Sequence, residues 1–597
     1  MAGCPCLIRK DSIMWTALRF VAIIACATTA SFAADGGRVL TDADLASGQT
    51  PQIGDTVILS DFARCYPHAA VGQENVKGKW WLRPYKTSGG ADGTALCVEA
   101  RDKDKPETCI APALTYPVSL EGVYDIWVCT YRPDYGGGID IKLTRDKVYG
   151  TIDPWEHAID AWPLKPGNAG KLVEVFWKTA ELAGQNIQLR QPHGTYQSLW
   201  WGVCNAHVTA IKLIRRDPAE AQQAAQAKAA APGRKGVIID RDGMSFVWMW
   251  GTEDFDCILQ QIEQFQYGNV EALNWCEGST FATNFPHPMS TGFTGQGPSG
   301  GRLGDFRCDR VDKSFQMRGI DVLQGLVDRC HEIGIKIYVS QRTSEGGSTD
   351  QSRAHPEWFL KTGLGKGWSP NWALPEVRTF LRDFMLYTAQ NYDIDGLTID
   401  FSRCRYNFEA GEEKPEYMTA YLRELRAGLD RIGEQRGKHL ALNASVAGRT
   451  WYEGRTPEQQ GLDVATWVHE SLIDCFMPEG SEIGRYLELC KGTKTRCYPR
   501  YCNWMDFEGN SLMANLHDPT PEEDKADRSP LFQYGPQQIA EGVAKWYQAG
   551  ADGVFLFNQS DAWTSLRNLP YPELLQKEVA AGKPDNLREG KEITWAQ

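Results

Sequence analysis

The chain carries few of the features by which a metal site or a nucleic-acid-binding surface is recognised in a sequence. Its ten histidines are scattered through 597 residues, and it has neither an HExxH segment nor paired CxxC motifs. A zinc site therefore has little support, and no cofactor is expected. The 63 basic residues are outnumbered by 76 acidic ones, for a formal net charge of −13. Such a chain is a poor electrostatic partner for nucleic acid, although a local basic pocket could still bind a sulfated or uronic sugar.

Long apolar runs are also missing beyond the first residues, so no membrane span is expected. At the N-terminus, three basic residues precede the apolar run Phe20–Ala27, and Ser31 and Ala33 supply the small residues that a signal peptidase reads. We predict a secretory signal over residues 1–33 and a secreted or periplasmic mature protein. Cleavage of this signal would remove three basic residues and one acid, so the net charge would change from −13 to −15. Lipid attachment at Cys26 is a weaker alternative.

Cysteine and tryptophan are, by contrast, plentiful. Of 17 cysteines, 14 follow residue 33, and an even number in an exported protein suggests disulfides whose pairing the spacing does not determine. Cys97 with Cys109, and Cys497 with Cys502, are plausible local pairs. The 21 tryptophans exceed the need of a core and suit stacking on sugar rings, although most are expected to be core residues.

An N-terminal β domain is predicted over residues 35–216. Short alternating segments between Gly, Pro and Asp turns are typical of an antiparallel β-sandwich. The pattern is similar to that of jelly-roll carbohydrate-binding modules, and the pairs Trp80, Trp81 and Trp200, Trp201 could form a sugar platform or equally fill the core. The clearest strand segments are Val118–Tyr131, Ile139–Leu143, Leu172–Trp177, Asn186–Leu189 and Val208–Ile214.

Residues 217–235, rich in Ala, Gln and charged side chains, are expected to be a partly helical linker. From 236 to 597 apolar strand segments alternate with amphipathic helices, which predicts a (β/α)8 TIM barrel with inserted loops. The Gly-, Pro- and Ser-rich stretch 278–304 would lie over its active face. A doubly wound open sheet is second choice, since no Gly-rich phosphate turn follows the first strand. The expected strands are Phe246–Trp250, Val270–Trp275, Ile335–Ser340, Gly396–Asp400, Leu440–Val446, Ile473–Pro478, Thr495–Tyr501 and Gly553–Asn558.

The segment NYDIDGLTIDFSR, residues 391–403, organises this domain. Its buried core Gly396–Ile399 ends at Asp400, and Pro375 can begin the amphipathic helix before it. Because the C-terminal ends of barrel strands form the catalytic face, Asp400 is predicted to reach the site.

Glycoside hydrolysis requires two carboxylates. Asp400 could act as the nucleophile, or else form a structural ion pair with Arg403 or Arg342. Glu479 follows an apolar run, whose neighbours would raise its pKa, and is therefore the choice for general acid/base. Its alternative is a loop acid with no role.

Other strand ends offer polar forks for hydroxyl groups and aromatic faces for sugar rings. The arginines could orient substrate or form structural ion pairs, and Glu253 and Glu277 compete for the catalytic roles. The predicted substrate-binding residues are Trp250, Glu253, Trp275, Glu277, Arg342, Arg403, Asn443, Arg500, Trp504 and Asn558.

Three motifs, HPEW (355–358), WSPNWALPEVRTFL (368–381) and YDIDGLTIDFSR (392–403), resemble glycosyl-hydrolase-like family 10, whose members are TIM barrels of secreted bacterial proteins. LNASV (442–446) agrees with this resemblance. The resemblance does not extend to the N-terminal sandwich. The family is similar in plan to α-amylase and α-galactosidase barrels, whose nucleophile is an aspartate that ends strand four. This implies that Asp400 is the nucleophile. The acid/base position varies among such families, so the resemblance bears less directly on Glu479.

Three functions remain open at this stage. The first is a secreted, retaining glycosidase that acts on a poly- or oligosaccharide. The second is a non-catalytic carbohydrate-binding or cell-surface protein on a barrel scaffold. The third is a metal-assisted hydrolase of another bond, since Asp and Asn are plentiful among the predicted strand ends. The sugar, its linkage and the oligomeric state are not determined by any of these patterns.

Overall fold

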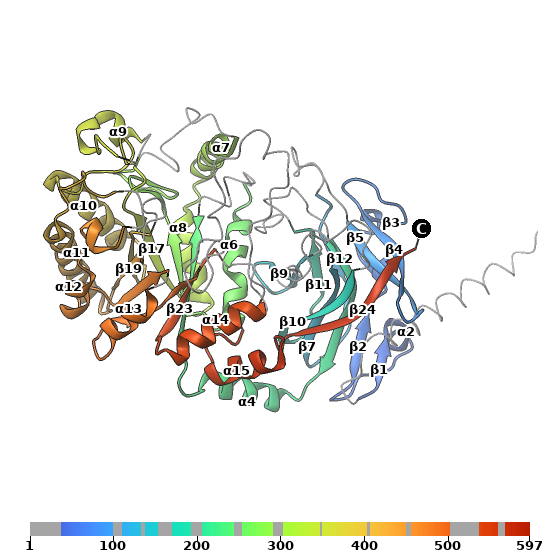
Figure 1. Cartoon of the computed structure of the whole chain (residues 1–597). Helices are drawn as coiled ribbons and strands as arrows, with labels where there is room; N and C mark the ends of the chain where they lie inside the picture. Colours follow the sequence, from blue (N-terminus) through green and yellow to red (C-terminus); the bar gives the residue numbers. More distant parts are fainter. Residues whose placement is uncertain are drawn as a thin grey trace, which may run out of the picture. The chain divides into compact units, whose positions relative to one another are not determined.

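The computed structural model describes residues 37–98, 110–132, 138–152, 170–192, 206–243, 247, 253–290, 303–346, 349–363, 365–402, 406–448, 455–480, 482–501, 536–558 and 567–596 (Figure 1). These residues divide into two compact units. One runs up to Ala230 and also includes the segment from Asp585, whereas the other spans Ala231–Pro584.

The first unit is built from two mainly antiparallel sheets, in which only the pairs β1–β2 and β3–β4 of the described strands are parallel. Its larger sheet has the order β1-β2-β12-β5-β4-β24-β10-β7, β3 pairs with β4, and β12 also pairs with β7. A smaller sheet has the order β6-β11-β8-β9. Each of the five strand segments expected from the sequence contains a strand. The bounds are β1 Val39–Thr41, β2 Thr56–Leu59, β3 Val71–Gly72, β4 Trp80–Thr87, β5 Asp92–Val98, β6 Leu114–Tyr116, β7 Val123–Arg132, β8 Ile139–Leu143, β9 Gly150–Ile152, β10 Lys171–Glu181, β11 Ile187–Arg190, β12 Ala206–Arg215 and β24 Leu587–Trp595.

The C-terminal strand β24 belongs to this first unit, although the sequence pattern placed residues up to 597 with the barrel. β24 pairs antiparallel with β10 on one edge and with β4 on the other. It also brings Trp595 against Tyr131, with ring centroids 4.9 Å apart. The last strand therefore completes the N-terminal sheet. A jelly-roll arrangement of the unit stays a prediction.

The segment expected to be a linker is largely helical. α4 spans Pro218–Ala229, and the side chain of Asp217 caps its N-terminus by accepting from the backbone amides of Ala219 and Glu220. None of its side chains is buried, as its Ala-, Gln- and charge-rich composition leads one to expect. Of the predicted aromatic platform, Trp80 is fully buried and Trp81 is partly buried, while Trp200 and Trp201 lie outside the described residues.

The second unit is a closed barrel of parallel strands, which confirms the predicted TIM barrel. The pairing order runs β13-β14-β17-β18-β19-β20-β22-β23, and β23 returns to β13. The strands are β13 Gly236–Asp242, β14 Ala272–Cys276, β17 Lys336–Arg342, β18 Gly396–Asp400, β19 Ala441–Ala447, β20 Cys475–Glu479, β21 Arg496–Cys497 with β22 Arg500–Tyr501, and β23 Gly553–Phe557. The main helices are α6 Phe255–Glu263, α7 Leu303–Arg318, α8 Val322–Glu332, α10 Pro375–Asn391, α11 Pro415–Arg436, α12 Val464–His469, α13 Ile483–Cys490, α14 Pro536–Gln548 and α15 Pro572–Ala581.

The prediction of the first barrel strand was wrong. The strand is β13, which pairs with both β14 and β23, and it lies ahead of the expected segment Phe246–Trp250. Of that segment only Val247 is described, and it is helical and buried. The run Val237–Ile239 is apolar and β-branched, but it follows directly on the predicted linker 217–235, and no strand was expected there. The expected loop 278–304 contains a short hairpin, β15 Gly278–Ser279 with β16 Ala282–Thr283.

The floor of the barrel is a cluster of buried side chains from most of the barrel strands. Its members are Ile238, Ala272, Tyr338, Ala441, Cys475, Met477, Tyr498 and Phe555. At β18 the wall is so close that a Cβ atom on Gly396 would collide with the carbonyl oxygen of Ala441. Only glycine fits at this position, and the strand it begins sets Asp400 in register with Arg342 of β17 and Ser445 of β19.

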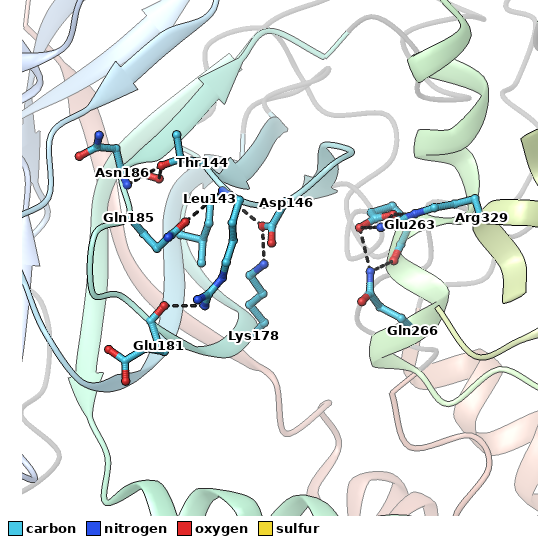
Figure 2. A network of polar contacts seen from close by, with 11 residues as sticks. Leu143, Thr144, Asp146, Lys178, Glu181, Gln185, Asn186, Glu263, Gln266 and Arg329 are labelled. Atoms are coloured by element: carbon cyan, nitrogen blue, oxygen red, sulfur yellow. Dashed lines mark hydrogen bonds and ion pairs between the residues drawn. The ribbon is translucent and has the colours of Figure 1, made fainter. Parts of the chain in front are cut away.

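Ion pairs supplement the apolar contacts in each unit (Figure 2). In the barrel, Arg329 of α8 donates to both carboxylate oxygens of Glu263 at the end of α6, with distances of 2.6 to 2.9 Å. In the first unit, Lys178 of β10 pairs with Asp146, which follows β8. Near Asp146, the backbone amide of Thr144 donates to the carbonyl oxygen of Asn186 at 3.0 Å. Within each unit, these contacts connect segments that are not adjacent in sequence.

Candidate active site

Charged side chains gather at the C-terminal ends of the barrel strands. The C-terminal ends of the parallel strands meet at one rim, and several of these strands carry polar residues at or next to that end. The contacts given below join the ends of β13, β14, β17, β18, β20 and β22. The polar residues concerned are Asp240, Asp242, Asn274, Arg342, Asp400, Ser402, Ser445, Glu479 and Arg500, all of them buried.

Asp400 is held at the end of β18 through one of its two carboxylate oxygens. Its Oδ1 accepts hydrogen bonds from the backbone amide of Ser402 at 2.8 Å and from the Ser402 hydroxyl. Arg500 Nη1 approaches the same oxygen at 3.8 Å. Within the described part of the chain, no residue bonds Oδ2. The carboxylate is thus oriented through one oxygen only.

Arg500 is the centre of this site. Its Nη1 lies 3.0 Å from Glu479 Oε2 and donates to the hydroxyl of Ser445 at 3.3 Å and to that of Ser402. Its guanidinium lies 4.6 Å from the ring centroid of Phe557. A guanidinium presents several donors in a rigid plane, so one side chain can orient two carboxylates and two hydroxyls. Arg500 therefore links β20 and β22 with the end of β18.

Asp240 lies on the missed first strand, two residues before its end. The amide nitrogen Nδ2 of Asn274 donates to its Oδ1, and the two residues are also register partners on β13 and β14. Burial is the main cause that raises the pKa of Asp240, to about 7, and the negative charge of Asp400 acts in the same direction. Arg500, Asn274 and Arg342 oppose the rise. Near neutral pH this carboxyl group is therefore partly protonated.

Asp242, two residues further along β13, forms a buried ion pair with Arg342. Arg342 Nη2 lies 2.9 Å from Asp242 Oδ2, and Nη1 lies 2.9 Å from Glu345 Oε2. These carboxylates hold the pKa of Arg342 well above its usual value, against the opposing effect of burial. Arg342 is thus in the site, as expected, but it is engaged by two protein carboxylates.

Three other predicted binding residues lie near the strand ends without facing the site. Trp275 alternates with Asn274 on β14 and donates from Nε1 to Asn284 Oδ1 at 3.1 Å. Asn558 accepts from the backbone amide of Asp242 at 2.9 Å, so it supports the end of β13. Glu253 bonds to α7, through Ser314 at 2.7 Å and Arg310 at 3.2 Å.

Asn443 and Glu277 are both fully buried. Asn443 donates to the Thr398 hydroxyl at 3.4 Å, between β19 and β18. The carboxylate oxygens of Glu277 have no hydrogen-bond partner among the described residues, and burial raises its pKa well above the usual value. Trp250, Arg403 and Trp504, which were also predicted to bind substrate, lie outside the described residues.

Sequence reasoning missed Asp240, Asp242 and the orienting role of Ser402. A signal for the first two was present, because GVIID repeats the pattern of GLTID, an apolar β-branched run that ends in an acid. For Ser402, the close spacing to Asp400 was visible, but a hydrogen bond back to that carboxylate depends on the turn after β18.

Two further observations bear on binding. In the part of the chain that the structure describes, no group of three or more His, Cys, Asp or Glu side chains has a metal-binding arrangement. Searched over the same residues, no helix is both long and apolar enough to cross a bilayer.

Comparison with known proteins identifies no family: no family model matches the sequence, and no curated protein matches it. The fold has many solved neighbours, among them several glycoside hydrolases. The maltogenic α-amylase AmyB from Thermotoga neapolitana has a TM-score of 0.33 and 10% identity, over 55% of this chain and 68% of its own. For the Group IV chitinase of Ostrinia furnacalis the values are 0.34 and 13%, over 58% and 100%.

A third neighbour, a variant of the α-galactosidase AgaA from Geobacillus stearothermophilus, has a TM-score of 0.31 and 11% identity, over 83% of this chain and 64% of its own. This chain thus matches less than two thirds of that enzyme. At such identities and scores the likeness carries no argument about activity. The assignment of the barrel rests on its strand pairing.

Proposed function

We propose that this protein is a glycoside hydrolase that cleaves a poly- or oligosaccharide with retention of configuration. The observation that carries the proposal is Asp400, buried at the end of β18 and oriented through Oδ1 by Ser402 while Oδ2 has no bonding partner among the described residues. A nucleophile needs this combination of a held carboxylate and an available oxygen.

In the first step, Oδ2 of Asp400 attacks the anomeric carbon while the leaving oxygen takes a proton. Water then attacks the glycosyl-enzyme and frees the carboxylate. Arg500 and the Ser402 groups hold the other oxygen and limit its motion. This ordering favours attack because less rotational freedom is lost at the transition state.

Glu479 is the proposed second carboxylate, assigned to acid/base chemistry. Its ion pair with Arg500, at 3.0 Å, stabilises the charged form of the carboxylate. That environment suits the base half of the role, in which a carboxylate accepts a proton from water. It suits the acid half less well, because a donor must hold its proton near neutral pH.

The wider setting completes the proposal. Export through the signal at residues 1–33 would bring the enzyme to extracellular or periplasmic glycans. A carbohydrate-binding role of the N-terminal sheets would hold it there. Membership of glycosyl-hydrolase-like family 10 is part of the same proposal and rests on the three sequence motifs.

The test is reducing-sugar release by the purified protein across plant, algal and bacterial glycans, with Asp400→Asn assayed beside it. Asp393→Asn is the matched control, because Asp393 is largely exposed and its pairing with Lys438 lies before β18. We expect release by the wild type and the control, and loss by Asp400→Asn. A 2-deoxy-2-fluoro glycoside of the cleaved sugar should label the peptide that contains Asp400. Equal release by wild type and Asp400→Asn would contradict the assignment, and silence of the wild type on the whole panel would favour a binding protein.

A further inference from the structure

We infer that Asp240 is the proton donor of the reaction, and that its carboxyl group protonates the glycosidic oxygen while Asp400 attacks the anomeric carbon. This inference rests on the proposed glycosidase function, and it names a catalytic residue on β13, a strand that the sequence patterns did not identify.

The position of Asp240 is fixed by its backbone contacts and by one carboxylate oxygen. Asp240 ends the apolar run of β13, and its backbone has contacts on both sides. On one side it is in register with β14. On the other side the backbone amide of Asn558, directly after β23, donates to the Asp240 carbonyl oxygen at 2.9 Å. Asn274 Nδ2 holds Oδ1. No residue in the described ranges bonds Oδ2, so one oxygen is held and the other has no bonding partner among these residues. Asp240 therefore has the same arrangement as Asp400.

Charged side chains from three other strands act on Asp240. The charged groups that act on Asp240 are Arg500 from β22, Arg342 from β17 and Asp400 from β18. Both arginines are already paired with other carboxylates, at 3.0 Å with Glu479 and at 2.9 Å with Asp242. Burial therefore dominates and raises the pKa of Asp240 to about 7. A carboxyl group that is partly protonated at neutral pH is suited to general acid catalysis.

Asp240 and Glu479, the two candidates for proton donor, differ in their charged neighbours. Both carboxyl groups are buried, but only Glu479 has a guanidinium within ion-pair distance among the described residues. One site thus contains one carboxyl group whose neighbour favours the charged form and one whose burial favours the neutral form. When the environments of two carboxyl groups favour different protonation states, the neutral group can act as the acid and the charged group can take the anionic role.

The chemical step balances with these two aspartates. The proton moves from Asp240 to the glycosidic oxygen, the bond from that oxygen to the anomeric carbon breaks, and Asp400 Oδ2 forms a bond to the same carbon. The products are an alcohol, a glycosyl ester on Asp400 and the Asp240 carboxylate. When water cleaves the ester, its proton returns to Asp240, so both aspartates regain their starting states and Asp240 takes both halves of the acid/base role in place of Glu479.

The experiment uses the full chain and aryl glycosides of the sugar that the wild type cleaves. A 2,4-dinitrophenyl leaving group departs without a proton, whereas a phenyl group needs one. For Asp240→Asn we expect a loss of about 10²- to 10⁴-fold in kcat/KM on the phenyl glycoside, and less than about 10-fold on the dinitrophenyl glycoside. The basic limb of the kcat/KM pH profile, which reports loss of the acid's proton, should disappear.

Glu479→Gln is the comparison variant in the same assay. If Glu479→Gln shows the dependence on the leaving group and Asp240→Asn does not, the inference is overturned and the glycosidase function stands with Glu479 as the acid. If the wild type cleaves no member of the panel, the proposed function fails, and the inference falls with it.

A second variant covers the case in which Asp240→Asn fails to fold. Asn274→Ala removes the hydrogen bond that stabilises the Asp240 carboxylate, so the basic limb should move to higher pH. In protein labelled with ¹³C at the aspartate carboxyl carbons, one resonance should titrate near pH 7 in the wild type and at higher pH in Asn274→Ala. The inference would be contradicted if Asn274→Ala left the basic limb of the kcat/KM profile at the same pH. It would also be contradicted if the aspartate resonance titrated at the same pH in both proteins.

Discussion

Arg500 Nη1 lies 3.0 Å from Glu479 Oε2, and both side chains are almost completely excluded from solvent. The same nitrogen lies 3.8 Å from Asp400, so one cation serves two carboxylates from two strands. In a buried site such an arrangement is sensitive to the loss of any member, because the remaining charges have no water to replace the missing partner.

Glu479→Gln and Arg500→Gln should each lower the free energy of unfolding by about 3 to 5 kcal/mol, since each leaves a buried charge with an incomplete set of partners. The double variant should lose less than the sum of the two single losses. Urea unfolding of all four proteins measures this coupling. Additive losses would mean that the two side chains do not act as a pair.

The stability of the protein should depend on pH through Asp240. Its pKa is raised from an ordinary value near 3.8 to about 7, so the folded state binds a proton that the unfolded state has released. Proton binding to Asp240 therefore stabilises the folded state, compared with a side chain that is always charged. This stabilisation is fully present below pH 3.8 and is lost as the pH rises through 7. Compared with Asp240→Asn, the wild type should lose on the order of 4 kcal/mol over the whole window, of which about 2.6 kcal/mol falls between pH 5 and pH 8. Unfolding curves of both proteins at pH 5 and pH 8 provide the measurement, and equal changes in the two would contradict the buried, protonated carboxyl.

The pair Glu263 and Arg329 should be important for packing α6 against α8. Arg329 donates to both oxygens of Glu263, and both residues are buried (Figure 2). Glu263→Gln should cost about 3 kcal/mol or more, because it leaves the guanidinium without its buried partner.

The matched control for this pair is Glu332→Gln. Arg329 also contacts Glu332, at 2.7 Å, but that carboxylate is 40% exposed and water can replace it. We expect a loss below about 1 kcal/mol for this variant. Thermal unfolding of the two variants checks the order, and equal losses would show that burial does not decide the effect.

The C-terminal strand should be required for the first unit. Removal of residues 585–597 would leave β4 and β10 each with an unpaired edge and would take Trp595 away from Tyr131. Because unpaired edges invite aggregation, we expect the truncated chain to be less soluble and its N-terminal sheets to be more sensitive to protease. Trp595→Ala is the milder test and should destabilise the unit without removing strand pairing. A truncated chain as protease-resistant as the wild type would contradict the role of β24.

How much of the molecule could be predicted depended on whether the information was local. Gly396–Asp400 is a strand within the predicted bounds because an apolar run ends in an acid, and α10 begins at Pro375 as expected because proline suits the first helical turn. The first strand was missed for a local reason as well. Its apolar run is short and follows directly on the predicted linker 217–235, so it was not recognised as a strand.

The catalytic assignments of Asp400 and Glu479 stay predictions, but their neighbourhoods illustrate the limit of sequence reasoning. The sequence indicated that both acids end barrel strands. It could not indicate that one arginine, distant from both acids in the chain, stands between them. That contact exists because the eight strands close into a ring, which brings β22 beside β20 and near the end of β18.

The sequence by itself determined the alternation of strands and helices, the β-rich character of the first unit and the acidic ends of several barrel strands, since each of these is set by residues close together in the chain. Only the tertiary structure decided that Asp240 joins the site, that Asn274 and Arg500 act on its carboxyl group, and that β24 returns to the N-terminal sheet. The physical reason is that burial and charge at a side chain depend on all the elements that surround it, and these come together only when the barrel closes and the sheet edges find their partners.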